Sequence, residues 1–241
     1  MVTGTPKMIT DGLVLYFDAA NVKSYPGSGT NWVDLSPSAA SATLTNGASF
    51  NGESNGVIRF DGTNDYIPTN FYGTYQRITL SAWVNNMSKP STAAHVIGKN
   101  YFYATTTNSW PCALSVGETG GSIAITNGSA YSITEGVNGG TASGPFTASR
   151  WNHIAGMYDG ATIKFYVNGL LTATQSYSGI INYSGSVGLP WTIGRPAGFN
   201  GGGTGFYYAT GSIAIASIYN RALSDTEILQ NYEATRERFG V

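Results

Sequence analysis

The sequence has little charge and almost no cysteine. Its 241 residues include 12 basic and 13 acidic side chains, which do not gather into runs. A chain with a net charge of -1 and no basic patch lacks the field that captures nucleic acid or an anionic membrane, so we expect neither partner. The single Cys112 cannot form an internal disulfide, which excludes a disulfide-stapled fold.

Long apolar runs are also missing. No stretch approaches the roughly 20 apolar residues of a membrane-spanning helix, and residues 1–7 lack the apolar core of a signal peptide. We therefore expect a soluble chain without an N-terminal export signal. Residues 1–12 are polar and unpatterned, so we interpret them as an N-terminal arm for which disorder is the default.

Glycine and small polar residues are abundant instead. The chain contains 32 glycines and many Ser, Thr and Asn residues, a composition typical of short strands joined by turns. Because the composition does not change along the chain, we predict one domain over residues 13–241 after the arm.

The stretch 151–169 gives the strongest structural signal. Asp159-Gly160 lies between two runs of alternating side chains, which predicts a hairpin with a type I′ turn. Asn168-Gly169 turns the chain again, so the stretch predicts a three-strand meander. Alternation predicts a core face and a wetter face. The core face contains Ile163, Phe165 and Val167, and the wetter face contains Lys164, Tyr166 and Asn168.

Further strands and one helix complete the predicted architecture. The other strand candidates include residues 13–17, 57–60, 78–84, 94–97, 101–104, 113–116, 122–126 and 131–134. Ser224 and Glu227 form a capping-box pattern that predicts a helix over about 224–237. Many short strands and one terminal helix predict an all-β fold, a two-sheet antiparallel jelly-roll sandwich with one short C-terminal helix.

Several motifs, in order along nearly the whole chain, carry a resemblance to a known family. They are Gly12-Leu13-Val14-Leu15-Tyr16-Phe17-Asp18-Ala19-Ala20-Asn21 with Trp32 and Asp34-Leu35-Ser36, Phe60-Asp61-Gly62 with Asp65-Tyr66, Ser81-Ala82-Trp83-Val84, the 151–169 hairpin, Ile193-Gly194-Arg195, and Ile218-Tyr219-Asn220-Arg221-Ala222-Leu223-Ser224. With these motifs the chain resembles a laminin-G-like jelly-roll domain of the concanavalin A-like lectin/glucanase superfamily. The resemblance implies the fold and leaves the function open, since this fold hosts lectins, adhesion modules, hydrolases and structural domains.

The acidic and histidine residues do not predict an enzyme. Glycoside hydrolysis needs two carboxylates about 5 to 9.5 Å apart across a cleft. Outside the terminal helix the one close acidic pair, Asp61 and Asp65, flanks Gly62 in a predicted turn, where aspartate caps local N–H groups. His153 lies in a predicted strand, where we expect a hydrogen-bonded structural role, and we assign no catalytic residue.

Calcium is the one cofactor that the loops leave open. Oxygen-rich loop residues, namely Asp18, Asn21, Asp61, Asn64 and Asp65, are candidate ligands, with local capping of backbone N–H groups as the alternative. Many proteins that the chain resembles carry a calcium-ligating acidic residue two positions after the Gly-x of a C-terminal Gly-x-Ile strand. Here Gly211-Ser212-Ile213 continues with Ala214 and Ile215, so we assign no metal ligand and expect no cofactor.

Aromatic residues are the better binding signal, because sugars stack their apolar C–H faces on aromatic rings and 13% of the chain is aromatic. The loop-borne candidates for ligand binding are Trp110, Trp191, Phe199, Tyr207 and Tyr208, followed by Tyr101 and Tyr103. Packing under a loop is the alternative for each of them. For Trp32, Trp83 and Trp151, which lie inside motifs or strands, we expect core packing.

These observations favour a non-catalytic structural protein of a tailed-phage virion, displayed on the capsid as decoration or on the tail. Residues 25–29 and 32–36 are similar to laminin-G-like domains of phage virions and bacterial surfaces, and Met1 without an export signal fits assembly inside a cell. The expected partners are the major capsid or tail protein, and glycans are candidate ligands. The alternatives are a secreted or cell-surface bacterial carbohydrate-binding module and a glycan hydrolase or lyase. Whether the chain forms a homo-oligomer is open.

Overall fold

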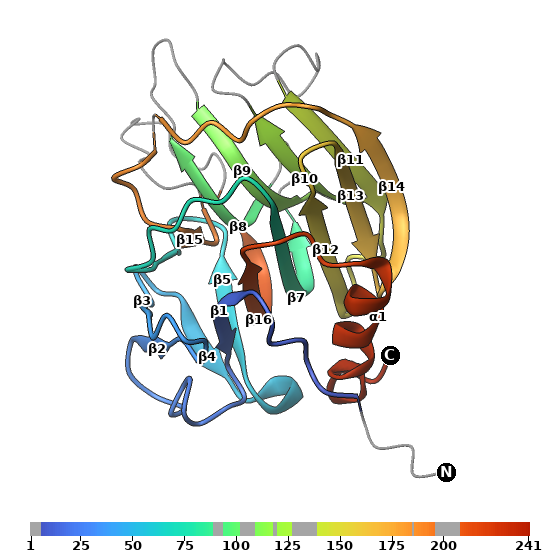
Figure 1. Ribbon diagram of the computed structural model, residues 1–241. Helices are drawn as coiled ribbons and strands as arrows, with labels where there is room; N and C mark the ends of the chain where they lie inside the picture. The colour runs from blue at the N-terminus through green and yellow to red at the C-terminus, as the bar shows by residue number, and fades with distance from the viewer. Residues whose placement is uncertain are drawn as a thin grey trace.

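A computed structural model of the chain describes residues 6–88, 94–101, 109–117, 120–126, 139–184, 186–195 and 208–241. Two antiparallel sheets dominate it (Figure 1). The larger, eight-stranded sheet consists of β14 (Leu170–Ser176), β13 (Thr162–Val167), β12 (Asn152–Tyr158), β7 (Ile78–Ser88), β16 (Thr210–Tyr219), β5 (Val57–Asp61) and β4 (Ser49–Asn51), with β1 (Leu13–Asp18) also paired to β16. The six-stranded sheet consists of β11 (Gly139–Pro145), β10 (Gly120–Thr126), β9 (Ser109–Val116), β8 (Ala94–Tyr101), β15 (Thr192–Ile193) and β6 (Ile67–Pro68).

Smaller elements flank the sheets. They are the pair β2 (Asn31–Val33) and β3 (Ser41–Thr43), the 3₁₀ helices η1 (Glu53–Asn55) and η2 (Arg236–Phe239), and the helix α1 (Asp225–Glu233). The predicted all-β jelly-roll sandwich with one C-terminal helix is therefore confirmed. Within the described residues, no helix has both the length and the apolarity to cross a membrane. The strand candidate 131–134 and most of 101–104 lie outside the described residues.

The core lies between the two sheets. Alternate residues Cys112, Leu114 and Val116 of β9 are buried in the same hydrophobic cluster as Ile163 and Phe165 of β13. Alternation therefore orients these strands as the sequence predicts, since successive side chains point to opposite faces. The core positions predicted for Trp32, Trp83 and Trp151 are also confirmed, because these side chains are 0%, 1% and 6% exposed.

A second buried layer covers the outer face of the larger sheet. There α1 and η2 pack against the central strands, as the red helix in Figure 1 shows. Phe239 of η2 stacks on Trp83 with ring centroids 4.0 Å apart, and Tyr166 donates a hydrogen bond of 2.7 Å to Asp225 of α1. The expected wetter position of Tyr166 is wrong, since this helix leaves its side chain 0% exposed.

The helix begins with the predicted capping box. The side chain of Ser224 accepts a hydrogen bond from the backbone N–H of Glu227, and the Glu227 carboxylate accepts one from the N–H of Ser224. The regular helix ends at Glu233, earlier than the predicted 237, and the chain continues into the separate turn η2. The boundary differs because Thr235 donates its N–H to the carbonyl of Tyr232, three residues back, so the α-helical hydrogen-bond ladder stops with Ala234 before the 3₁₀ turn begins.

The two hairpin turns of the meander differ in type. In the first turn only Gly160 has a positive φ, 101°, which is the pattern of a type II′ turn rather than the predicted I′. In the second turn both Asn168 (52°) and Gly169 (77°) have positive φ, as a type I′ turn requires. Asp159 instead accepts hydrogen bonds from the N–H groups of Ala161 and Thr162, which stabilises the first turn from its side chain.

The described part of the N-terminal arm is attached to the domain. Ile9 donates its N–H to Asn231 Oδ1 (2.8 Å) and accepts a hydrogen bond from Tyr219 Oη (3.0 Å). The guanidinium of Arg221 forms an ion pair with Asp11 (2.9 Å). The default of disorder is therefore wrong for residues 7–11, because buried polar groups of α1 and β16 find their partners in this backbone.

Candidate functional site

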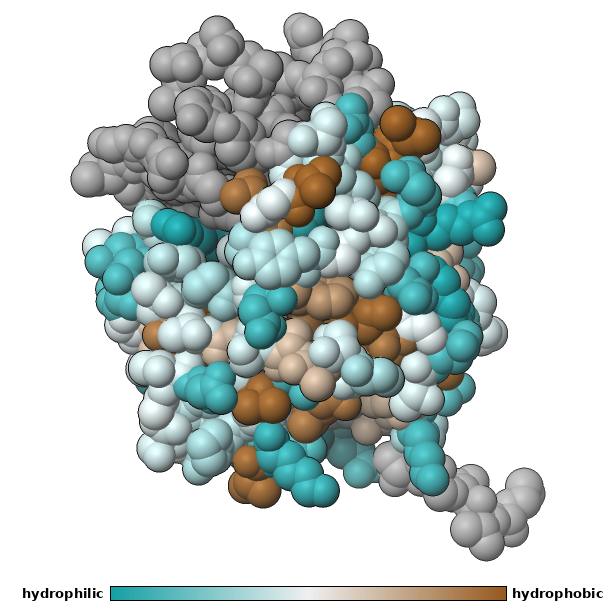
Figure 2. Space-filling view, turned by 60° about the vertical axis from the view of Figure 1, so that its left-hand side comes forward, coloured by the Kyte–Doolittle hydropathy of each residue, from teal (hydrophilic) through white to brown (hydrophobic). Residues whose placement is uncertain are grey.

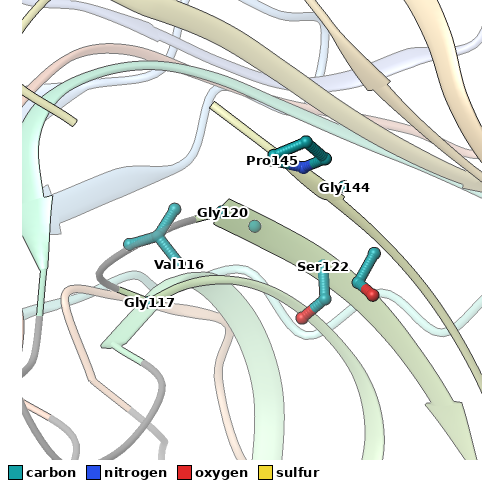
Figure 3. Close-up of a pocket in the computed structure, with 8 residues that line it drawn as sticks. Val116, Gly117, Gly120, Ser122, Gly144 and Pro145 are labelled. Carbon is teal, nitrogen blue, oxygen red and sulfur yellow. The ribbon is translucent and has the colours of Figure 1, made fainter. Parts of the chain in front are cut away.

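A groove lies where the β9–β10 hairpin meets the end of β11 (Figure 3). Its volume is about 440 Å³. Its lining consists of Val116, Gly117, Gly120, Gly121, Ser122, Ser143, Gly144 and Pro145, and we call it the Gly-Ser groove. None of these residues is charged, so the groove suits a neutral ligand better than an ion.

Glycines shape the groove because the strands pack too closely for side chains. Gly121 is paired with Gly144 across β10 and β11. A Cβ on Gly121 would lie 2.8 Å from the ring of Phe165, and one on Gly144 would meet the γ-methyl of Thr172. The missing side chains let the smaller sheet approach β13 and β14, and the backbone of Gly120, Gly121 and Gly144 lines the groove.

The polar groups of the groove are two serines opposite each other. Ser122 and Ser143 are register partners in the β10–β11 ladder. Their neighbours Ile123 and Ala142 are in the core, so the serine side chains occupy the opposite face of the sheet. Within the described part of the chain neither hydroxyl has a hydrogen-bond partner, and each can donate and accept.

The predicted aromatic residues do not line this groove. Trp191 is 0% exposed and donates its indole N–H to the carbonyl of Gly73 (2.9 Å), so its assignment as a loop-borne ligand residue is wrong. It packs in the main core because β15 begins at the next residue. Phe199, Tyr207 and the side chain of Trp110 lie outside the described residues, as do the side chains of Tyr101 and Tyr103.

Tyr208 belongs to a separate aromatic cluster. Arg195 donates from Nη1 to Tyr208 Oη (3.1 Å), and its guanidinium lies 3.4 Å from the centre of the Tyr66 ring. A guanidinium held over a tyrosine face is stabilised by the quadrupole of the ring. In the structure Tyr208 contacts Arg195 of the same domain. That Tyr208 also binds a ligand stays a prediction.

The paired carboxylates are engaged in a turn, as expected. Asp65 is 2% exposed and accepts a hydrogen bond from the N–H of Asp61 (2.8 Å), while Asp61 accepts one from the N–H of Thr63 (2.7 Å). Burial raises the pKa of Asp65, and the hydrogen bond from Asp61 opposes that shift. Neither residue lines the Gly-Ser groove.

The oxygen-rich loops considered for calcium have local partners. Asp18 forms an ion pair with Arg238 (2.6 Å) and caps the N–H of Ala20, while Asn21 caps the N–H of Lys23. Among the residues that the structure describes, no three His, Cys, Asp or Glu side chains form a group able to hold a metal ion. A cation beside Asp18 would also meet the guanidinium charge.

The histidine inside the meander is buried and hydrogen-bonded, as predicted. His153 is 3% exposed, and its Nε2 lies 2.8 Å from Ser81 Oγ. Burial lowers the pKa of His153 to about 4, so the ring is neutral near pH 7. Trp83 and Tyr232 cover the ring at centroid distances of 5.5 and 6.1 Å. This Ser-His pair is closed off from substrate and acts in packing.

Sequence reasoning missed the residues of the Gly-Ser groove. The available signal was the pair of mirrored triplets Gly120-Gly121-Ser122 and Ser143-Gly144-Pro145, in which a serine neighbours a glycine that tolerates close packing. Figure 2 shows, on one face, hydrophobic residues in small groups separated by hydrophilic and neutral ones.

Solved structures share this fold at low sequence identity. A sialidase from Trypanosoma rangeli matches 99% of the chain at 17% identity with a TM-score of 0.65, and the match covers 36% of the sialidase. The receptor-binding domain of botulinum neurotoxin type G matches 92% of the chain at 14% identity (TM-score 0.64), over 51% of its own length. The binding domain of Paraclostridial mosquitocidal protein 1 matches 92% at 13% identity (TM-score 0.61), over 52% of its length.

The chain thus spans about half or less of the length of these structures, and the likeness shows the fold alone. A comparison with curated proteins finds no match. The family model of laminin-G-like domains described as the concanavalin A-like lectin/glucanases superfamily matches residues 61–229, which is most of the chain. Together with the two-sheet sandwich, this match shows that the chain belongs to the concanavalin A-like lectin/glucanase superfamily.

Proposed function

We propose that the protein is a non-catalytic carbohydrate-binding module whose Gly-Ser groove takes a neutral sugar. The observation that carries this proposal is the uncharged groove with two opposed serine hydroxyls, Ser122 and Ser143, beside the exposed ring of Pro145. Hydroxyls that donate and accept match the hydroxyls of a sugar, and the proline ring offers an apolar surface to its C–H face.

The lack of carboxylates among the described residues of the groove supports binding without hydrolysis. The two mechanisms that use paired carboxylates need them on either side of the bound sugar. The described residues that line the Gly-Ser groove are all uncharged, and in the described part of the chain Asp61 and Asp65 cap their own turn. An assay of reducing ends released from polysaccharides tests this part of the proposal. A hydrolytic activity that stays with the protein through purification overturns it.

We place the module on a tailed-phage particle, on the capsid or the tail, in contact with the major capsid or tail protein. The support is the resemblance of residues 25–29 and 32–36 to laminin-G-like domains of phage virions. A secreted or cell-surface bacterial module is the alternative with the same groove. Mass spectrometry of purified particles decides between them, because the chain co-purifies with capsid or tail proteins only in the first case.

Binding at the groove is tested with a pair of serine variants. On a glycan array followed by calorimetry, Ser122→Ala with Ser143→Ala raises the Kd of the best neutral glycan about tenfold, since each lost hydrogen bond contributes about 0.5–1.5 kcal/mol. Ser28→Ala with Ser149→Ala is the matched control, because both serines are exposed and lie outside the groove. Equal affinity of the two double variants rules out the Gly-Ser groove as the binding site.

A further inference from the structure

A second groove lies between the end of β1, η1 and η2. Its volume is about 510 Å³, within the range of about 300–1,000 Å³ that is usual for ligand pockets. Its lining consists of Asp18, Ala20, Asn21, Val22, Asn55 and Arg238, and we call it the Arg238 groove. It shares no residue with the Gly-Ser groove and is built on the larger sheet, with η1 at the bottom of the view in Figure 1.

Arg238 ties the three walls of this groove together. Its Nη1 donates to Asp18 Oδ1 (2.6 Å), its Nε donates to the carbonyl of Ser54 (2.7 Å), and its Nη2 donates to the carbonyl of Gly56. The side chain is only 13% exposed. Because each guanidinium nitrogen is engaged and the charge is paired with Asp18, the groove presents no free charge to a ligand.

Polar atoms remain available beside this ion pair. The hydrogen bonds that the Asp18 carboxylate accepts in the described part of the chain all end on Oδ1, from Arg238 and from the N–H of Ala20, so Oδ2 remains an acceptor. Asn21 uses Oδ1 to cap Lys23 and keeps its amide N–H groups. The exposed amide of Asn55 has no partner among the described residues.

The backbone holds Asn55 at the groove in the left-handed region. Ser54 and Asn55 are consecutive non-glycine residues with φ of 46° and 65°. A run of two such residues is uncommon outside glycine and persists where the surrounding structure enforces it. Here Arg238 binds the carbonyls of Ser54 and Gly56, on either side of Asn55. The backbone that carries the amide is therefore fixed before any ligand arrives.

We propose that the Arg238 groove is a second site, which binds a neutral polyhydroxylated ligand such as an uncharged sugar. The amides of Asn55 and Asn21 donate to adjacent hydroxyls, and Asp18 Oδ2 accepts from a hydroxyl, which matches a ligand with several neighbouring OH groups. Val22, 77% exposed, packs against the C–H face of the ring. The ion pair at the wall disfavours a charged ligand, because a carboxylate meets Asp18 and an ammonium group meets Arg238.

The test uses Asn55→Gly, which removes the amide while glycine keeps the positive φ without strain. Asn86→Gly is the matched control, since Asn86 is also exposed, has φ of 50° and lies outside both grooves. The probes are the methyl glycosides of glucose, galactose and mannose, with glucuronate and glucosamine as charged counterparts. Binding is followed by NMR through the side-chain amide signals of Asn21 and Asn55.

We expect a neutral glycoside to shift these amide signals and the charged sugars to bind more weakly. Asn55→Gly raises the Kd about tenfold, equivalent to about 1.4 kcal/mol, while Asn86→Gly leaves it unchanged. The Ser122→Ala and Ser143→Ala variant keeps this binding, so the two grooves are told apart. Unshifted amide signals with every neutral probe, an unchanged Kd in Asn55→Gly, or tighter binding of a charged sugar each overturn the Arg238 groove without touching the Gly-Ser groove.

Discussion

Replacing Phe239 by alanine tests whether the C-terminal turn is part of the domain core. The ring of Phe239 lies 4.0 Å from that of Trp83 and 4.8 Å from that of Trp151, measured between centroids. Its side chain is 7% exposed and belongs to the cluster that covers the outer face of the larger sheet. Phe239→Ala therefore opens a cavity over two tryptophans that are otherwise buried.

The expected loss of stability follows from burial and ring contacts. Truncation of a buried phenylalanine typically costs about 3–5 kcal/mol, of which an aromatic pair contributes about 0.5–1.5 kcal/mol. The short η2 spans only Arg236–Phe239 and can move into the cavity, so we expect a loss of about 3 kcal/mol. Phe239→Leu keeps most of the volume and loses the stacked rings, so we expect about 1 kcal/mol.

Equilibrium unfolding in urea, followed by tryptophan fluorescence, measures both variants. The midpoint falls and the slope m stays constant, because the surface exposed on unfolding hardly changes. The folded baseline of Phe239→Ala also shifts to longer wavelength as water reaches Trp83 and Trp151. A loss below about 1 kcal/mol for Phe239→Ala, or equal losses for alanine and leucine, would refute the reasoning that η2 completes the core.

Three further perturbations probe other contacts. Gly144→Ala costs about 1–3 kcal/mol in urea unfolding because its Cβ meets the γ-methyl of Thr172, and Thr172→Ala in the same chain recovers part of the loss. Hydrogen bonds from Arg221 lower the pKa of Glu227 to about 2 from its usual 4.5. Their contribution to the free energy of unfolding is therefore complete above pH 4.5 and is lost as pH falls toward 2. If the melting temperature of Glu227→Gln falls as steeply in acid as that of the unchanged protein, this reasoning is wrong. Deleting residues 1–12 costs about 1–3 kcal/mol by leaving the partners of Ile9 unpaired, and an unchanged melting temperature contradicts it.

Local signals predicted the parts of the fold that depend on neighbouring residues. The capping box of Ser224 and Glu227 is local, since its hydrogen bonds join residues three positions apart. The Asn168-Gly169 turn is local as well, because both residues tolerate the positive φ that they adopt. The first turn was assigned to the wrong type, since Gly160 takes positive φ at the first central position while Asp159 serves as a cap. Dipeptide identity gives the place of a turn more reliably than its geometry.

Burial that depends on distant segments was not predictable. Alternation along β13 places Tyr166 opposite the core, yet α1 lies over it and Asp225 accepts a hydrogen bond from its hydroxyl. Trp191 follows a loop in sequence and is nevertheless fully buried, with the carbonyl of Gly73 as its partner. In both cases the contact joins residues more than fifty positions apart, which periodicity within one strand does not encode.

The candidate sites escaped prediction for a related reason. A search for ligand-binding residues among large aromatic side chains selects residues that are often buried in the core. Trp191, which is 0% exposed, is the example that the structure describes. The Gly-Ser groove brings together serines of β10 and β11 that meet only when the strands pair, and the Arg238 groove arises from a contact between residues 18 and 238. The glycine-serine triplets alone do not mark the first groove, because strand pairing and long-range ion pairs are properties of the folded chain.

The distribution of buried faces limits where a ligand can bind. The larger sheet packs its inner face on the smaller sheet, and α1 with η2 occupies the outer face of its central strands, where Trp83, Ala214 and Tyr219 are buried. A ligand that met this sheet face would have to displace η2, whose Phe239 and Arg238 are both anchored. The margins of the sandwich remain, and both grooves lie there. The turn η2 thus covers the sheet through Phe239 and shapes a groove through Arg238. Two variants separate these roles: Phe239→Leu lowers stability and leaves the amide of Asn55 in place, whereas Asn55→Gly changes the groove and leaves the aromatic stack intact.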